Sequence, residues 1–136
     1  MLPLQYAPRW RSASIVLLLV VLLAAISPAV WFWPDRVRIL SWLATFDKWA
    51  HAATFALLAV WFAGQYRPRS YWRIAIGLVG YGLLIEICQR MVGYRTAECL
   101  DIAADATGII IGLAIATAGI GGWSLRFESW LIRKRA

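Results

Sequence analysis

The chain has 136 residues and a formal net charge of +7; 62% of its residues are hydrophobic and only 15% are charged. A soluble globular domain averages about 45–50% apolar and about 25% charged residues, so this composition excludes a soluble domain, a disordered chain and a disulfide-rich secreted scaffold. The basic residues flank apolar runs instead of clustering on one soluble face, which argues against nucleic-acid binding and for an integral membrane protein.

Four apolar segments are long enough to cross a bilayer as helices, because about 20 residues cover about 30 Å of hydrocarbon. We predict transmembrane spans at residues 14–33, 49–66, 72–92 and 101–123. Residues 27–29 loosely resemble a signal-peptide cleavage site, but Pro28 and the length of the apolar run favour a first span that is retained. The chain has no internal repeat and no linker, so we expect a single domain over residues 1–136.

Two shorter segments have the composition of membrane-surface elements. Residues 34–46 mix charged and apolar side chains, which predicts a short interfacial helix between the first two spans and not a fifth crossing. Residues 124–136 form a basic, partly amphipathic tail whose Phe127 and Trp130 suit the membrane interface. The expected fold class is therefore all-α: an integral membrane bundle of four transmembrane helices with a short interfacial segment between the first two.

The distribution of lysine and arginine orients this bundle. With an even number of crossings, the two termini and the loop after the second span share one side. That side holds nine of the fourteen basic residues, namely Arg9, Arg11, Arg67, Arg69, Arg73, Arg126, Arg133, Lys134 and Arg135. Because cytoplasmic segments carry an excess of basic residues, we expect both termini in the cytoplasm. Every acidic residue except Glu128 lies on or near the opposite, outer side, which gives that side the chemical variety of a binding site.

Polar side chains recur at helical spacing near the outer ends of three predicted spans. Positions four apart share a helix face, and such pairs open the second and fourth spans. A carboxylate that faces lipid costs about 2.5–3.5 kcal/mol at the helix centre, so we expect these groups to turn inward, toward basic partners. The sequence thus predicts an outward-opening polar pocket, whose ligand-binding residues are Asp47, Lys48, His51, Glu86, Gln89, Arg90, Arg95, Asp101 and Asp105.

Gly108 and Gly112 form a small-residue pair on the fourth predicted span. Such pairs let two helix backbones approach closely. The two aspartates share this face, so we favour helix packing inside the bundle over dimerisation. The oligomeric state remains open.

The order and spacing of these groups resemble the VanZ-like family over about residues 40–118. The matching pattern comprises Asp47, Lys48, His51, Glu86, Gln89, Arg95, Asp101, Asp105, Gly108 and Gly112. Members of that family are small multi-span bacterial membrane proteins, named for a component of a glycopeptide-resistance cluster linked to low-level teicoplanin resistance. The resemblance implies a place in the bacterial inner membrane and an envelope-associated role, with no established catalytic chemistry. Asp105 departs from the pattern, which typically has asparagine there, so the ligand preference need not carry over.

Several chemistries remain open for the polar residues. His51 suits proton transfer or metal binding, but a lone histidine makes a poor metal site, and we favour a histidine that orders its helix start by hydrogen bonding. The acidic residues suit a divalent cation, an acid–base pair or a structural salt-bridge network. No Ser–His–acid spacing, phosphate-binding glycine loop or zinc-protease signature is present, so we lean against an enzyme and predict no metal and no cofactor.

Two cysteines, Cys88 and Cys99, both fall on the outer half of the chain. Their spacing permits a disulfide in an oxidising compartment. Two cysteines in so apolar a chain are more often reduced packing residues, which is the state we expect.

The predicted function follows from the outward pocket. We expect it to bind a membrane lipid or a lipid-linked cell-wall component, with a consequence for glycopeptide susceptibility. One alternative is a membrane-embedded enzyme that modifies a lipid or lipid-linked sugar, with Glu86 or His51 as the base. Another is a small transporter, although the cytoplasmic halves of the spans hold almost no polar side chains.

Overall fold

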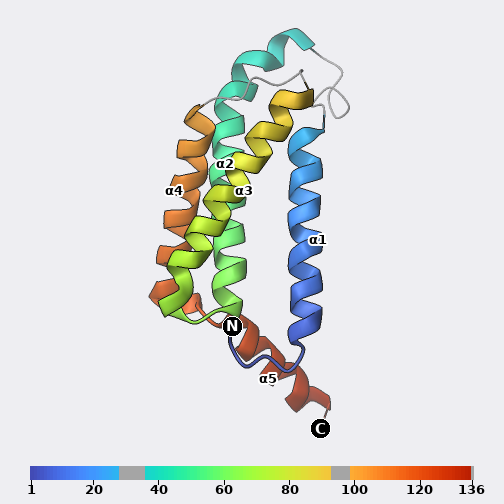
Figure 1. The fold of residues 1–136 in the computed structure, drawn as a ribbon, viewed down its shortest axis with the longest axis vertical. Helices are drawn as coiled ribbons and strands as arrows, with labels where there is room; N and C mark the ends of the chain where they lie inside the picture. Colours follow the sequence, from blue (N-terminus) through green and yellow to red (C-terminus); the bar gives the residue numbers. More distant parts are fainter. Residues whose placement is uncertain (28–35, 93–98, 136) are drawn as a thin grey trace.

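The computed structural model describes the backbone of residues 1–27, 36–92 and 99–135, and the side chains of residues 1–27, 48–92 and 100–134. All regular elements in this part of the chain are helices, in agreement with the predicted all-α class (Figure 1). In chain order they are α1 (Ala7–Ile26), α2 (Arg36–Gln65), η2 (Pro68–Ser70), α3 (Tyr71–Val92), α4 (Cys99–Ile115), η3 (Ala116–Ile120) and α5 (Trp123–Arg135).

Three helical segments in the described ranges are long and apolar enough to cross a membrane: Ala7–Ile26, Pro68–Val92 and Leu100–Ile120. The chain is accordingly a multi-pass membrane protein. These segments correspond to the first, third and fourth predicted spans. The second predicted span, residues 49–66, lies in α2, which is not one of the three, so the count of four crossings stays a prediction.

The first helix differs from its predicted limits of residues 14–33. It begins earlier, at Ala7, and ends at Ile26, after which Ser27 is extended with φ −72° and ψ 137°. Pro28 follows, and a proline disfavours the helical conformation of the residue before it. Proline also lacks the N–H that would continue the helix, which is why the helix ends here although the apolar run continues. Residues 28–33 lie outside the described part.

Residues 36–46, the greater part of the predicted interfacial segment, are the first turns of α2. They therefore belong to the same helix as the second predicted span instead of forming a separate short helix. In Figure 1 these turns, in teal, bend away from the axis of the rest of α2. Their place at a membrane surface stays a prediction.

The tightest helix pair is α2 with α4. A Cβ atom added at Gly108 would collide with the backbone carbonyl of Ala52, and one at Gly112 would collide with that of Ala56. The two backbones are thus in direct contact, as small residues permit. Between these helices and α3 lies the core, formed by Phe55, Leu58, Ala59, Ala63, Ile74, Leu78, Ile85 and Ile109.

The helices run alternately up and down, so both termini and the α2–α3 turn lie at one end of the molecule (Figure 1). At that end the chain turns through Gly119 and Gly122, whose φ angles of 140° and 69° favour glycine, into α5. Ser124 then donates a hydrogen bond to the carbonyl of Gly64, and the indole of Trp123 donates one to the carbonyl of Val60 at 3.2 Å. These bonds hold α5 against the end of α2.

Candidate functional site

Side chains from three helices meet near the end of the bundle opposite the termini. His51 comes from α2, Glu86 from α3, and Asp101 and Asp105 from α4. All four are buried, and the most exposed of them, His51, retains only 8% of its accessible surface. Buried ionisable groups inside a membrane bundle are costly and mark candidate functional sites.

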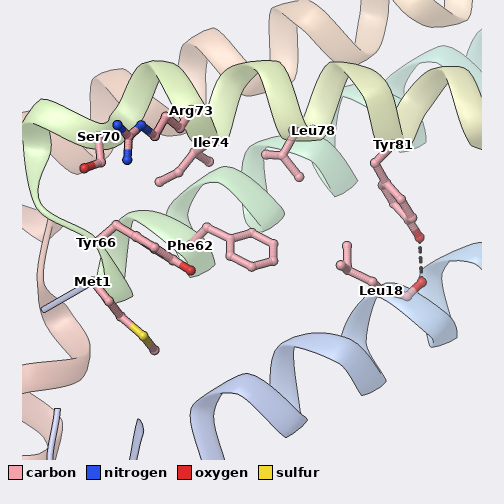
Figure 2. Close-up of a pocket in the computed structure, with 10 residues that line it drawn as sticks. Met1, Leu18, Phe62, Tyr66, Ser70, Arg73, Ile74, Leu78 and Tyr81 are labelled. Carbon is pink, nitrogen blue, oxygen red and sulfur yellow. Dashed lines mark hydrogen bonds between the residues drawn. The ribbon is translucent and has the colours of Figure 1, made fainter. Parts of the chain in front are cut away.

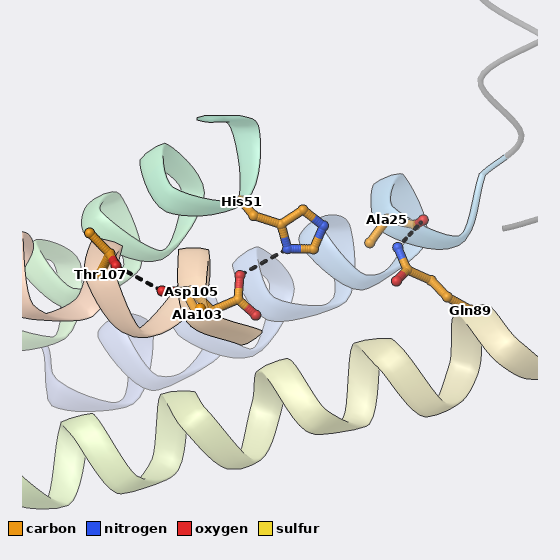
Figure 3. A network of polar contacts seen from close by, with 6 residues as sticks. All are labelled: Ala25, His51, Gln89, Ala103, Asp105 and Thr107. Carbon is orange, nitrogen blue, oxygen red and sulfur yellow. Dashed lines mark hydrogen bonds and ion pairs between the residues drawn. The ribbon is translucent and has the colours of Figure 1, made fainter. Parts of the chain in front are cut away.

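The centre of this cluster is a hydrogen-bonded pair of side chains between α2 and α4. His51 Nδ1 donates a hydrogen bond to Asp105 Oδ1 at 2.8 Å, within the range of charge-assisted bonds (Figure 3). The close approach of the two backbones at Gly108 brings these side chains within reach. The additional carboxylate at position 105 therefore has a cationic or neutral imidazole as its partner, and His51 does more than order the start of its own helix.

Helix α3 packs against the same Asp105 carboxylate at Gly82. A Cβ atom at Gly82 would lie 2.6 Å from Asp105 Oδ2, so a larger residue there would displace the aspartate side chain. One turn further along α3, Glu86 lies within electrostatic range of Asp101, Asp105, His51 and Arg90. The three helices thus bring three carboxylates and one imidazole into a single electrostatic unit.

Three acceptor atoms of this unit have no hydrogen-bond partner among the described residues. They are both carboxylate oxygens of Glu86 and Oδ2 of Asp105, and all three are buried. A buried acceptor left without a donor costs about 1–3 kcal/mol, and more if it is charged. The cluster is therefore suited to accept hydrogen bonds from a donor-rich ligand or to hold a proton.

The remaining predicted site residues have different places. Gln89 is buried and donates from Nε2 to the carbonyl of Ala25 at 3.1 Å, which ties α3 to the last turns of α1 (Figure 3). Arg90 is exposed, and Lys48 is half-buried and takes part in an interaction. The side chains of Asp47 and Arg95 lie outside the described part of the chain.

A cavity of about 240 Å³ adjoins the cluster between α1, α2 and α3. His51 and Thr54 contribute its polar wall, and its other lining residues are Val21, Ala24, Ala25, Ala50, Phe55 and Ile85. The polar groups are thus packed against one another, and the adjoining space is mainly apolar. This combination suits an amphiphile better than a small hydrophilic solute.

The family model described as VanZ/LLP1 matches residues 5–120. The chain belongs to the VanZ/LLP1 family. No curated protein and no solved structure matches it.

The family match confirms the resemblance drawn from the sequence and also takes in α1, which that resemblance had left out. It covers every described residue of the His51–Asp105–Glu86 cluster and ends at η3. In the VanZ/LLP1 chain described here, α5 therefore follows the matched region.

Within the described ranges, no group of three or more His, Cys, Asp or Glu side chains has the arrangement to hold a metal ion. Cys88 is a free cysteine, and the side chain of Cys99 lies outside the described part.

Sequence reasoning missed a second set of buried polar residues, at the end of the bundle that carries the termini. Ser14 accepts hydrogen bonds from Trp61 Nε1 at 2.9 Å and from Gln65 Nε2 at 3.0 Å. Glu128 of α5 accepts three, from the backbone N–H groups of Gln5 and Tyr6 and from Trp10 Nε1. The available signal was Glu128 itself, the single acidic residue in a basic tail.

Proposed function

We propose that this VanZ-family membrane protein binds a hydrogen-bond-donating component of the bacterial envelope at the His51–Asp105–Glu86 cluster. The component is a membrane lipid or a lipid-linked cell-wall precursor, and its capture changes susceptibility to glycopeptides of the teicoplanin type. In this proposal the protein lies in the inner membrane with both termini in the cytoplasm, and the cluster lies near the outer surface.

The observation that carries the proposal is the set of buried carboxylate oxygens without a donor on Glu86 and Asp105. Hydroxyl and amide N–H groups, which abound in sugar and peptide headgroups, are the donors that such oxygens bind. The mainly apolar cavity beside His51 supports entry of the attached lipid portion from the side, between α1 and α3. Carboxylates shielded from water by such walls form stronger hydrogen bonds than they would in water.

Replacement of Glu86 tests the proposal. Glu86→Gln keeps the size of the side chain but removes its charge and one acceptor, so binding of a labelled lipid-linked cell-wall precursor in nanodiscs should weaken by about tenfold or more. Cells that carry the variant should also lose any change in glycopeptide susceptibility, at an unchanged level of protein in the membrane.

Glu128→Gln is the matched control, because it removes the same charge from another buried glutamate, at the far end of the bundle. It should leave precursor binding unchanged. Wild-type affinity in Glu86→Gln, or equal losses in both variants, would remove the cluster from the proposed function.

The His51–Asp105 bond favours a second candidate, a membrane-embedded enzyme that acts on a lipid or lipid-linked sugar. An aspartate that holds one imidazole nitrogen orients the ring as a general base, and His51 lines the adjoining cavity. Purified protein should then convert a component of a labelled lipid extract, and His51→Gln should abolish this turnover. Binding without turnover in the wild type supports the first candidate.

A further inference from the structure

A second cavity, of about 330 Å³, lies at the end of the bundle that carries the termini, far along the helices from His51. It lies between α1, α2 and α3 and is partly open, and its walls include Leu18, Phe62, Ile74, Leu78 and Tyr81 (Figure 2). The side chains of these residues point into the space between the helices. The cavity is therefore a mainly apolar groove.

The groove leads into a polar hollow of about 530 Å³ lined by Met1, Arg67, Arg69, Ser70 and Arg73. Met1, Ser70 and Arg73 line both spaces, so the apolar groove and the basic hollow adjoin each other. An apolar channel that ends at clustered positive charge matches an amphiphile with an anionic head.

The three arginines are exposed, and none of their guanidinium groups is hydrogen-bonded or ion-paired to another described residue. None of the described residues that line the hollow is acidic. The Arg73 guanidinium lies over the Trp72 ring, 5.2 Å from its centroid, a contact that leaves its N–H groups available. Guanidinium groups bind phosphate oxygens in a bidentate manner, and these three, within one turn and the adjoining helix start, carry a charge of +3 with no acidic partner among the described residues. This arrangement is complementary to a phosphate group.

The length of the groove matches one leaflet of a bilayer. It extends along α3 from Arg73 to Tyr81, eight residues, or about 12 Å at 1.5 Å per residue. Half of the hydrocarbon thickness is about 15 Å. Tyr81 closes the inner end, where its hydroxyl donates a hydrogen bond to the carbonyl of Leu18 and so joins α3 to α1 (Figure 2).

We propose that this groove binds an anionic phospholipid of the leaflet at the terminal end of the bundle. The phosphate lies among Arg67, Arg69 and Arg73, and one acyl chain follows the groove between α1 and α3 as far as Tyr81. The site is separate from the His51–Asp105–Glu86 cluster and goes beyond the function proposed for it.

The test is retention of lipid by the full-length protein, purified in detergent with equal amounts of phosphatidylglycerol and phosphatidylcholine and measured by native mass spectrometry. The wild type should retain phosphatidylglycerol over phosphatidylcholine by about tenfold. The triple variant Arg67→Gln, Arg69→Gln, Arg73→Gln should lose this preference. The control triple Arg11→Gln, Arg133→Gln, Lys134→Gln removes equal charge elsewhere at the same end and should keep it.

A matched glycine pair tests the groove itself. Gly77 lines the groove and Gly80 does not, and nothing lies within 4 Å of a Cβ added at either position. Gly77→Leu should reduce retention of phosphatidylglycerol about tenfold by filling the groove, while Gly80→Leu, with the same change in helix propensity, should retain it as the wild type does.

Glu86→Gln should leave phosphatidylglycerol retention unchanged, which separates this site from the outer cluster. Three results would overturn the proposal: equal retention of the two lipids by the wild type, equal losses in the two triple variants, or wild-type retention by Gly77→Leu. Equal losses would mean that basic residues attract anionic lipid wherever they lie at this end.

Discussion

At the scale of single residues, the His51–Asp105 pair dominates the candidate site because each group depends on the other for its burial. Asp105 carries one oxygen bonded to His51 Nδ1 and a second that faces Gly82 without a donor. Removal of His51 leaves the buried Asp105 carboxylate without this donor, whereas removal of both side chains leaves neither group unpaired across this bond. The pair should therefore show strong energetic coupling.

A double-mutant cycle measures this coupling. His51→Ala and Asp105→Ala should each lower the free energy of unfolding. For His51→Ala the loss should be about 1–3 kcal/mol, because the buried Asp105 carboxylate loses its hydrogen-bond donor. The double variant should be less destabilised than the sum of the two single variants, as judged by reversible unfolding in mixed micelles. Additive effects would mean that the bond contributes nothing of its own.

At the scale of helices, backbone contact between α2 and α4 positions His51 opposite Asp105. The contact depends on Gly108 and Gly112, each of which faces a backbone carbonyl of α2. A second contact at this scale involves α5, whose Glu128 accepts hydrogen bonds from the backbone N–H groups of Gln5 and Tyr6. In both cases one or two residues of a helix position another part of the chain: the glycines of α4 contact the backbone of α2, and Glu128 of α5 binds the segment before α1.

Enlargement of the interfacial glycines should separate the two helices. Gly108→Ala or Gly112→Ala should destabilise the protein by about 1–3 kcal/mol, because the new methyl group overlaps the backbone of Ala52 or Ala56. Gly80→Ala is the control in open space on α3 and should stabilise the fold by about 0.5–1 kcal/mol. Thermal unfolding in detergent compares the three, and a destabilised control would undermine the packing argument.

Loss of the Glu128 carboxylate should release the segment before α1. Glu128→Ala removes the acceptor of two backbone N–H groups and of the Trp10 indole, so amide exchange of Gln5 and Tyr6 should accelerate. Hydrogen–deuterium exchange measures this, and Ser129→Ala, which alters the exposed neighbouring residue, is the control. Unchanged exchange in Glu128→Ala would show that other contacts hold the segment.

At the scale of the whole molecule, the alternation of α1 to α4 brings both termini to one end (Figure 1). The His51–Asp105–Glu86 cluster, from the start of α4, the end of α3 and the facing part of α2, lies toward the other end. Such an arrangement in a bilayer requires α2 to cross it together with the three apolar segments. The long α2, with 30 residues, has sufficient length to do so.

Cysteine labelling tests this topology. In a variant without Cys88 and Cys99, Gln5→Cys and Ser129→Cys, at exposed positions before α1 and in α5, should each react only with reagent supplied from the cytoplasmic side. Met91→Cys, at the exposed end of α3, should react only from the outer side, and because α2 lies between Gln5 and Met91 the three positions together test its crossing. Intact cells and inverted vesicles provide the two sides. Labelling of Gln5→Cys from the outer side, or of Met91→Cys from the cytoplasmic side, would exclude four crossings with the cluster at the outer end.

Much of the architecture could be predicted from the sequence, because the hydrophobic length needed to cross a bilayer is a local property. Composition indicated a membrane protein, and the lengths of the apolar runs indicated an all-α bundle. Helical spacing singled out His51, Glu86, Asp101 and Asp105. The end of α1 was mispredicted because the apolar run continues past Pro28, where local backbone chemistry stops the helix.

Tertiary structure alone decided which of these groups touch. Hydrogen-bond partners come from helices more than fifty residues apart in sequence, as in the pairs His51 with Asp105 and Ser14 with Gln65. The distance between such groups depends on how closely two backbones approach, which Gly108 permits but does not by itself specify. The same reason applies to the apolar groove and the adjoining basic hollow. From the sequence, the three arginines indicated only the orientation of the chain in the membrane, and it is the packing of α1 against α2 and α3 that places an apolar cavity beside them.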